Sequence, residues 1–82
     1  MAVEVKTTLR QLREELLNPK VSQETMARKV GISLQWYRLL ETGQQQKTSW
    51  STGNAILKAL NTERLARGLA ELTLEQLGLK IV

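Results

Sequence analysis

The feature that most constrains the fold is a pair of short helical segments joined by only three residues. Ser22 is a good N-cap for the first segment, and Gly31 is typical of a helix that ends in left-handed geometry. Ser33 can cap the second segment, which ends at Gly43. A connection this tight forces the two helices to cross at a large angle and to share one core. The sequence therefore predicts two crossed helices within residues 22–43.

Two further helices are predicted on either side of this pair. Thr8 begins a capping box ahead of a leucine stripe, and Asn18-Pro19 ends the helix, because proline disfavours helical geometry in the residue before it. Ser51 is the expected N-cap of a longer helix that stops near Gly68, with Trp50 as a hydrophobic staple on it. These segments would supply the apolar faces against which the crossed pair packs.

The C-terminal part of the chain predicts a short fifth helix. Thr73 opens a second capping box, and Gly78 ends the segment. Strand signals are nearly absent, with period-two alternation only at Val3–Val5. We therefore expect an all-α bundle of five helices in one domain, residues 1–82, with an apolar C-terminal extension at residues 62–82. Part of this extension covers the core, and its surplus either completes the core or forms a two-fold dimer interface.

Composition narrows the function. The 82 residues include no cysteine and no histidine, so thiolate chemistry, histidine acid–base catalysis and the usual metal ligands are missing, and no metal or cofactor is expected. No convincing carboxylate pair is present, and we expect a binding protein rather than an enzyme. No apolar run is long enough to cross a membrane, and Glu4 and Lys6 break any signal peptide, so a cytoplasmic protein is expected.

The net charge of +4 is confined to the middle of the chain. Residues 18–61 contain six basic and two acidic side chains, whereas the rest of the chain contains six of each. A local positive field suits a polyanion such as DNA, although a charge of this size is also ordinary for the surface of a small domain.

Residues 22–43 resemble the helix-turn-helix of the phage-repressor and Cro-like family, often called XRE-like. The shared features are Gln23 opening the first helix, Ala27 within it, Gly31 in the turn, Ser33 opening the second helix, and Leu40-Glu41-Thr42-Gly43 closing it. The likeness extends in outline over Thr8–Leu60. It implies a lambda-repressor-like DNA-binding fold and a transcriptional regulator that places its second motif helix in the major groove of double-stranded DNA.

The helix after Ser33 divides into two sides at about 100° per residue. One side is expected to face the core: Ser33, Trp36, Tyr37 and Leu40. The other is expected to face outward: Leu34, Gln35, Arg38 and Thr42. Gln35 can bond adenine and Arg38 can bond guanine or a phosphate, whereas Leu34 can contact thymine methyls without adding hydrogen-bond specificity. The predicted DNA-contacting residues are Gln23, Ser33, Leu34, Gln35, Arg38, Thr42, Gln46 and Lys47.

The outer members of this set are expected to hold the DNA backbone. Gln23 lies at a helix N-terminus, which attracts phosphate, and Thr42, Gln46 and Lys47 would hold the backbone on the other flank. The resemblance also implies a largely buried ion pair between Arg13 and Glu41.

Two other functions stay open on the sequence alone. One is an antitoxin-like protein that combines DNA binding with a toxin partner. The other is a protein-interaction module in which Leu34 and Leu39 form an apolar docking surface. Binding to duplex DNA that weakens steeply with salt would separate a DNA-binding protein from an apolar docking module.

Overall fold

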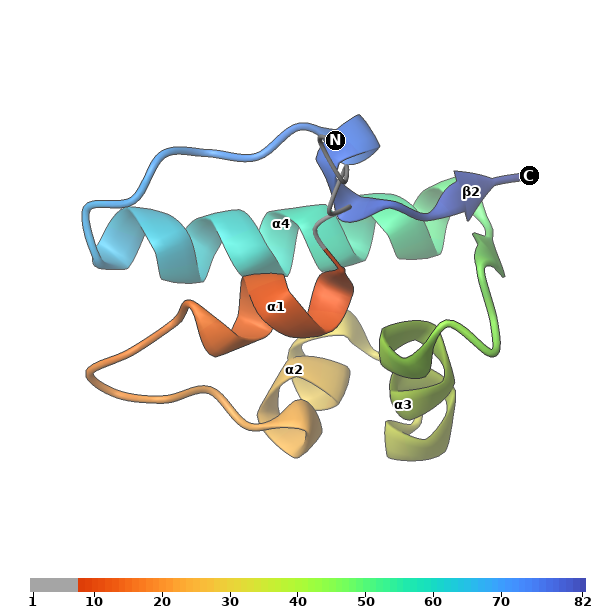
Figure 1. Cartoon of the computed structure of the whole chain (residues 1–82), viewed down its shortest axis with the longest axis horizontal. Helices are drawn as coiled ribbons and strands as arrows, with labels where there is room; N and C mark the ends of the chain where they lie inside the picture. Colours follow the sequence, from red (N-terminus) through yellow and green to blue (C-terminus); the bar gives the residue numbers. More distant parts are fainter. Residues whose placement is uncertain (1–7) are drawn as a thin grey trace, which may run out of the picture.

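The computed structural model describes residues 8–82. Over this range the chain forms four α-helices, one 3₁₀ turn and two short strands: α1 (Leu9–Glu14), α2 (Gln23–Val30), α3 (Leu34–Thr42), β1 (Lys47–Thr48), α4 (Trp50–Ala66), η1 (Leu74–Leu77) and β2 (Lys80–Ile81). Helix α4 runs across the molecule, with α1, α2 and α3 on one side and the C-terminal segment returning along the other (Figure 1). The opening segment, for which the sequence predicts no signal peptide, lies outside the described residues, as does the alternation at Val3–Val5.

The caps predicted for α2 and α3 are confirmed. The side chain of Ser22 accepts a hydrogen bond from the Thr25 amide at 3.1 Å, and Ser33 accepts from Trp36 at the same distance. Gly31 ends α2 with φ of 87°, a left-handed conformation that glycine adopts without the steric cost of a Cβ. These local signals fix the three-residue turn and with it the crossing of α2 and α3.

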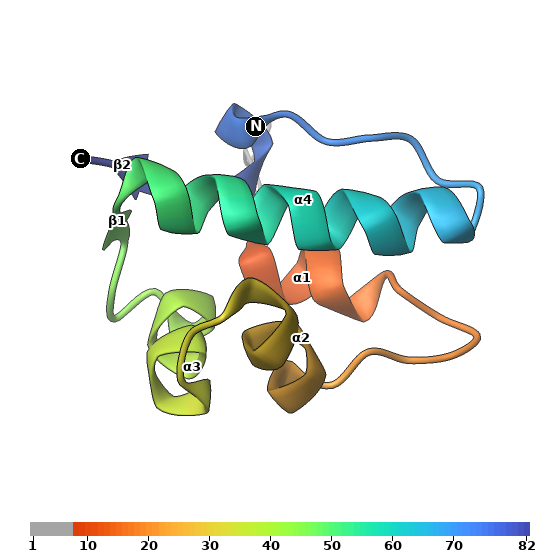
Figure 2. The same cartoon turned by 180° about the vertical axis from the view of Figure 1, so that it is seen from behind.

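The core lies between α4 and the three helices α1, α2 and α3, which Figure 2 shows from behind on one side of α4. Its fully buried large side chains are Leu16, Met26, Tyr37, Ile56, Leu60 and Leu77. Leu9 and Leu12 of the predicted α1 stripe are buried as well. Because Leu77 belongs to this set, the C-terminal segment supplies part of the core. Leu65, near the end of α4, and Val82, at the end of this segment, stay exposed.

The first helix ends earlier than predicted. It stops at Glu14, four residues before Asn18-Pro19, and the chain that follows is held from the end of α4 instead. The guanidinium of Arg67 donates hydrogen bonds to the carbonyls of Leu17 at 2.9 Å and Pro19 at 2.6 Å. This segment therefore takes its backbone partners from the far end of α4.

The predicted start of the fourth helix is wrong by two residues. Ser49, not Ser51, is the N-cap, and its hydroxyl accepts from the Thr52 amide at 3.2 Å. Trp50 is therefore inside the helix rather than ahead of it, with 61% of its surface exposed. The staple predicted for Trp50 does not form.

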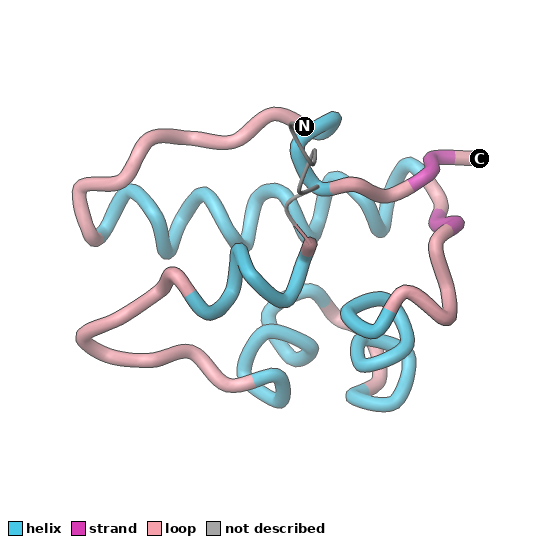
Figure 3. The backbone as a smooth tube through the Cα atoms, in the orientation of Figure 1, coloured by secondary structure: helices cyan, strands magenta, loops and turns pink. Residues whose placement is uncertain are grey.

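The fifth α-helix is replaced by a 3₁₀ turn and a strand. Thr73 and Gly78 bound the element as predicted, but the four residues between them form η1. The chain then pairs in parallel with the segment after α3, so β1 and β2 form a small sheet (Figure 3). The all-α expectation holds for the body of the molecule and fails at this pair. A partner strand 33 residues away leaves no local periodicity in the sequence.

Candidate nucleic-acid interface

Helix α3 presents a polar outer side over a buried inner side. Tyr37 and Leu40 are buried, whereas Gln35, Arg38 and Thr42 are exposed, as predicted. The only acidic side chain of α3 belongs to Glu41 and is buried. The outer side of α3 therefore carries hydrogen-bonding groups and positive charge, with no carboxylate to repel a polyanion.

Three residues depart from the predicted division. Ser33 was expected to face the core, but it is exposed as the N-cap of α3. Trp36 was expected in the core, but 36% of its surface is exposed, because the buried side of α3 is centred on Tyr37, with Leu40 and Glu41 on either side, and Trp36 lies at its edge. Leu34 was expected to face outward, but it is half-buried and packs against the core. Leu39 is half-buried as well. The exposed surface of α3 thus includes the Trp36 ring, which was not predicted, and less of Leu34 than was predicted.

An ion pair between α1 and α3 lies beneath this helix. Arg13 donates from Nε to Oε2 of Glu41 at 2.7 Å and from Nη2 to Oε1 at 3.3 Å, and its third group, Nη1, donates to the carbonyl of Val21 at 3.0 Å. The Glu41 side chain is fully buried and that of Arg13 is 15% exposed. The pair implied by the family resemblance is thus formed, and it ties α3 to α1 and to the residue preceding the N-cap of α2.

Burial and hydrogen bonding act in opposite directions on Glu41. Burial alone would raise the pKa of its carboxyl group, but Arg13 and, to a smaller extent, the neighbouring Tyr37 hydroxyl and Gln23 outweigh this and lower the pKa below its ordinary value. The same hydrogen bond from Arg13 to Glu41 raises the pKa of Arg13. Burial raises the pKa of the neighbouring Tyr37, whose hydroxyl has no hydrogen-bond partner among the described residues. At neutral pH Arg13 and Glu41 are therefore both charged, and Tyr37 is neutral.

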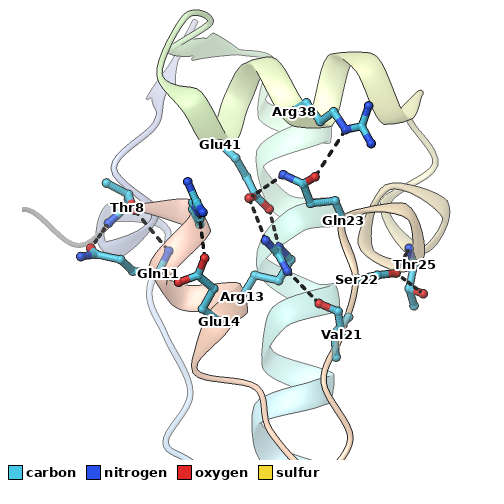
Figure 4. Close-up of polar contacts among 11 residues, drawn as sticks. Thr8, Gln11, Arg13, Glu14, Val21, Ser22, Gln23, Thr25, Arg38 and Glu41 are labelled. Carbon is cyan, nitrogen blue, oxygen red and sulfur yellow. Dashed lines mark hydrogen bonds and ion pairs between the residues drawn. The ribbon is translucent and has the colours of Figure 1, made fainter.

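Gln23 connects this buried pair to the outer side of α3 (Figure 4). Its Nε2 donates to Oε1 of Glu41 at 3.0 Å. A carboxylate can only accept hydrogen bonds, so the Gln23 amide is oriented with its oxygen away from Glu41. That oxygen accepts from Nε of Arg38 at 3.4 Å. The chain Arg13–Glu41–Gln23–Arg38 thus places two of the predicted DNA contacts side by side.

The remaining predicted contacts lie at the two ends of α3. Ser33 uses its hydroxyl oxygen for the N-cap of α3, and Thr42 donates its hydroxyl to the carbonyl of Leu39 at 3.2 Å. Gln46 and Lys47 are exposed in the segment that follows α3. Gln46 also accepts a backbone hydrogen bond from Lys80 at 2.8 Å, which joins this flank to the C-terminal strand.

The sequence did not single out Lys80, which the strand register places opposite Lys47. Lys80 falls in the part of the chain with no excess charge, and it is distant from the crossed helices in sequence. A tendency of residues 79–82 to form a strand would have been the one available signal, and a four-residue segment is too short to give it.

Fold and surface together define a helix-turn-helix protein: two helices cross through a three-residue turn, and the second exposes a polar, acid-free side. A family model described as a helix-turn-helix domain matches residues 7–70. The chain belongs to this family, which implies DNA binding and agrees with its resemblance to repressor and Cro-like proteins. No curated protein and no solved structure matches the chain. Among the described residues, no helix is long and apolar enough to cross a membrane.

Proposed function

We propose that this protein is a sequence-specific regulator of transcription that binds double-stranded DNA with α3 in the major groove. The observation that carries the proposal is the outer side of α3, where Gln35 and Arg38 are exposed and no carboxylate is. An exposed glutamine matches the donor and acceptor pattern of adenine, and an arginine matches that of guanine.

The buried network supports a specific role for Arg38. Gln23 accepts from its Nε, so both terminal nitrogens of the guanidinium are left to donate together to the O6 and N7 atoms of guanine. The contact with Gln23 thereby turns the terminal nitrogens of Arg38 away from the Gln23 amide. We therefore assign Arg38 to base reading and Gln23 to positioning it.

The two alternatives make different predictions. The apolar docking surface would need Leu34 and Leu39, and both are half-buried, which favours DNA as the ligand of α3. The antitoxin-like hypothesis shares the DNA-binding step and adds a protein partner.

Dimerisation on a two-fold DNA site remains a prediction, with Leu65 and Val82 as exposed apolar residues available for it. Sedimentation of the protein at tens of micromolar, with and without DNA, tests the dimer.

Selection of bound duplexes from a random pool tests the proposal directly. The wild type should enrich one motif, and Arg38→Ala should lose the preference at one guanine position at a cost of about 1–3 kcal/mol. Gln35→Ala should relax a different position. Arg10→Ala is the matched control, because Arg10 is exposed on α1 and pairs with Glu14. A motif left unaltered by both α3 variants would reject Gln35 and Arg38 as base readers.

A further inference from the structure

The C-terminal strand places a second lysine beside the segment that follows α3. In the parallel register Lys47 pairs with Lys80, and Thr48 pairs with Ile81. Backbone hydrogen bonds hold this register, from the Lys80 amide to Gln46 at 2.8 Å and from the Val82 amide to Thr48 at 3.0 Å. Neighbouring strands lie about 4.8 Å apart, so the two lysines begin from adjacent points.

The two faces of the strand pair differ. Thr48 is buried, and Ile81 packs so closely on α4 that a Cβ at Gly53 would lie 2.6 Å from its Cδ1 atom. Successive residues of a strand point to opposite faces, and paired residues share a face. Lys47 and Lys80 therefore both point to the other face, and both are exposed.

The exposed ammonium groups of Lys47 and Lys80 repel each other. Like charges directly opposite each other in a sheet are destabilising. Neither lysine forms an ion pair with a carboxylate of the described residues. A bound anion would remove the repulsion, and the pair lies beside the first turn of α4, at the end of the segment that leads from α3 into α4 (Figure 2).

We propose that Lys47 and Lys80 together hold one stretch of DNA backbone phosphate, with Lys80 as a contact that lies outside the helix-turn-helix family match, which ends at residue 70. The inference rests on the proposed DNA binding. Two ammonium groups at one strand spacing suit phosphate oxygens as point charges and read no base. The C-terminal strand thereby adds to the affinity for all DNA sequences alike.

Charge variants of Lys80 test this proposal on the intact chain. Lys80→Gln should weaken binding about 5- to 10-fold near 0.1 M salt, equally for the selected duplex and an unrelated one, and should lower the salt slope of log K by about 0.9. Lys47→Gln should do the same. Lys58→Gln is the matched control, since Lys58 is an exposed lysine of α4 beside Lys29 and Thr62, and its Kd should stay within about twofold.

Charge reversal separates binding from folding. Lys80→Glu would replace the repulsion by attraction to Lys47, so its Tm at low salt should rise by about 1–5 °C while its DNA affinity falls below that of Lys80→Gln. A lower Tm for Lys80→Glu would overturn the like-charge argument. If Lys80→Gln matched Lys58→Gln while Lys47→Gln bound weakly, the role of Lys80 would be rejected and DNA binding would stand. If the wild type bound no duplex at any salt concentration, the proposed function itself would fail.

Discussion

The segments at residues 33–43 and 73–78 have the same kind of boundaries and fold differently. Each begins at a hydroxyl residue and ends at a glycine with positive φ, 81° at Gly43 and 71° at Gly78. The first encloses nine residues and forms an α-helix, whereas the second encloses four and forms a 3₁₀ turn. Four residues give a single turn, which does not repay the cost of nucleating an α-helix. Capping residues therefore fix where an element begins and ends, and the length between them decides its type.

The two regions are also stabilised by different means. The helix-turn-helix is tied to α1 through the buried charges of Arg13 and Glu41. The C-terminal segment buries Leu77, and side chains of α4 satisfy its backbone: Asn61 exchanges two hydrogen bonds with Leu72, and Arg64 donates to the carbonyl of Ala70 at 2.7 Å. The helix-turn-helix depends on a polar network, and the C-terminal segment depends on apolar burial and backbone pairing. Single substitutions can test the two contributions separately.

Removal of the Arg13 side chain should produce the largest loss of stability. Arg13→Ala leaves the buried carboxylate of Glu41 without its charged partner, so we expect about 3–5 kcal/mol less free energy of unfolding. Chemical denaturation measures this change. Arg10→Ala breaks an exposed ion pair with Glu14 one turn away and should cost less than about 1 kcal/mol. Equal stability of the two variants would show that the buried pair does not hold α3.

Acid should reduce the difference in unfolding free energy between the wild type and Arg13→Ala. The pKa of Glu41 is lowered in the folded protein, so the stabilisation from its charge is present above the pKa of an unfolded glutamate, about 4.3, and is lost as the pH falls through the lower folded value. The gap between wild type and Arg13→Ala should therefore narrow below about pH 4. A gap that stayed constant in acid would assign the effect of Arg13 to packing.

Loss of Leu77 tests the other region. Leu77→Ala should cost about 2–4 kcal/mol, because this side chain of η1 is buried in the core and its removal leaves a cavity. Leu65→Ala, at an exposed position of α4, should change stability by less than about 0.5 kcal/mol. If Leu77→Ala were as mild as Leu65→Ala, the C-terminal segment would be a covering layer and not part of the core.

This contrast explains what the sequence could predict. The caps Ser22 and Ser33 and the glycine at position 31 act within a few residues, so the helix-turn-helix and the exposure of Gln35 and Arg38 followed from local pattern. Strand β2 pairs with the backbone of Gln46 and Thr48, and the chain after the early end of α1 is held by Arg67. Such long-range partners leave no periodic signal in the sequence.

The N-cap of α3 should give a smaller effect and sharpen the comparison of the two capped segments. Ser33→Ala removes the hydroxyl that accepts from the Trp36 amide and should cost about 1 kcal/mol. Thr73→Ala should cost less, because the 2.7 Å hydrogen bond to Gln76 comes from the Thr73 backbone amide, which alanine keeps. Thermal melts of both variants measure the difference. Equal losses would show that the C-terminal turn depends on its cap as strongly as α3 does.

The smallest effect on stability is expected from removing the buried hydroxyl of Tyr37. This change tests whether Tyr37 contributes to the helix-turn-helix through apolar packing or through the polar network. Because this hydroxyl has no hydrogen-bond partner among the described residues, Tyr37→Phe should leave the free energy of unfolding unchanged or raise it by up to about 1 kcal/mol. Tyr37→Leu, which also removes the ring from a fully buried site, should be clearly destabilising. A loss above about 1 kcal/mol for Tyr37→Phe would mean that the hydroxyl donates to the neighbouring Glu41 carboxylate. Tyr37 would then belong to the network that orients Gln23 and Arg38, and the variant should also weaken the guanine preference assigned to Arg38.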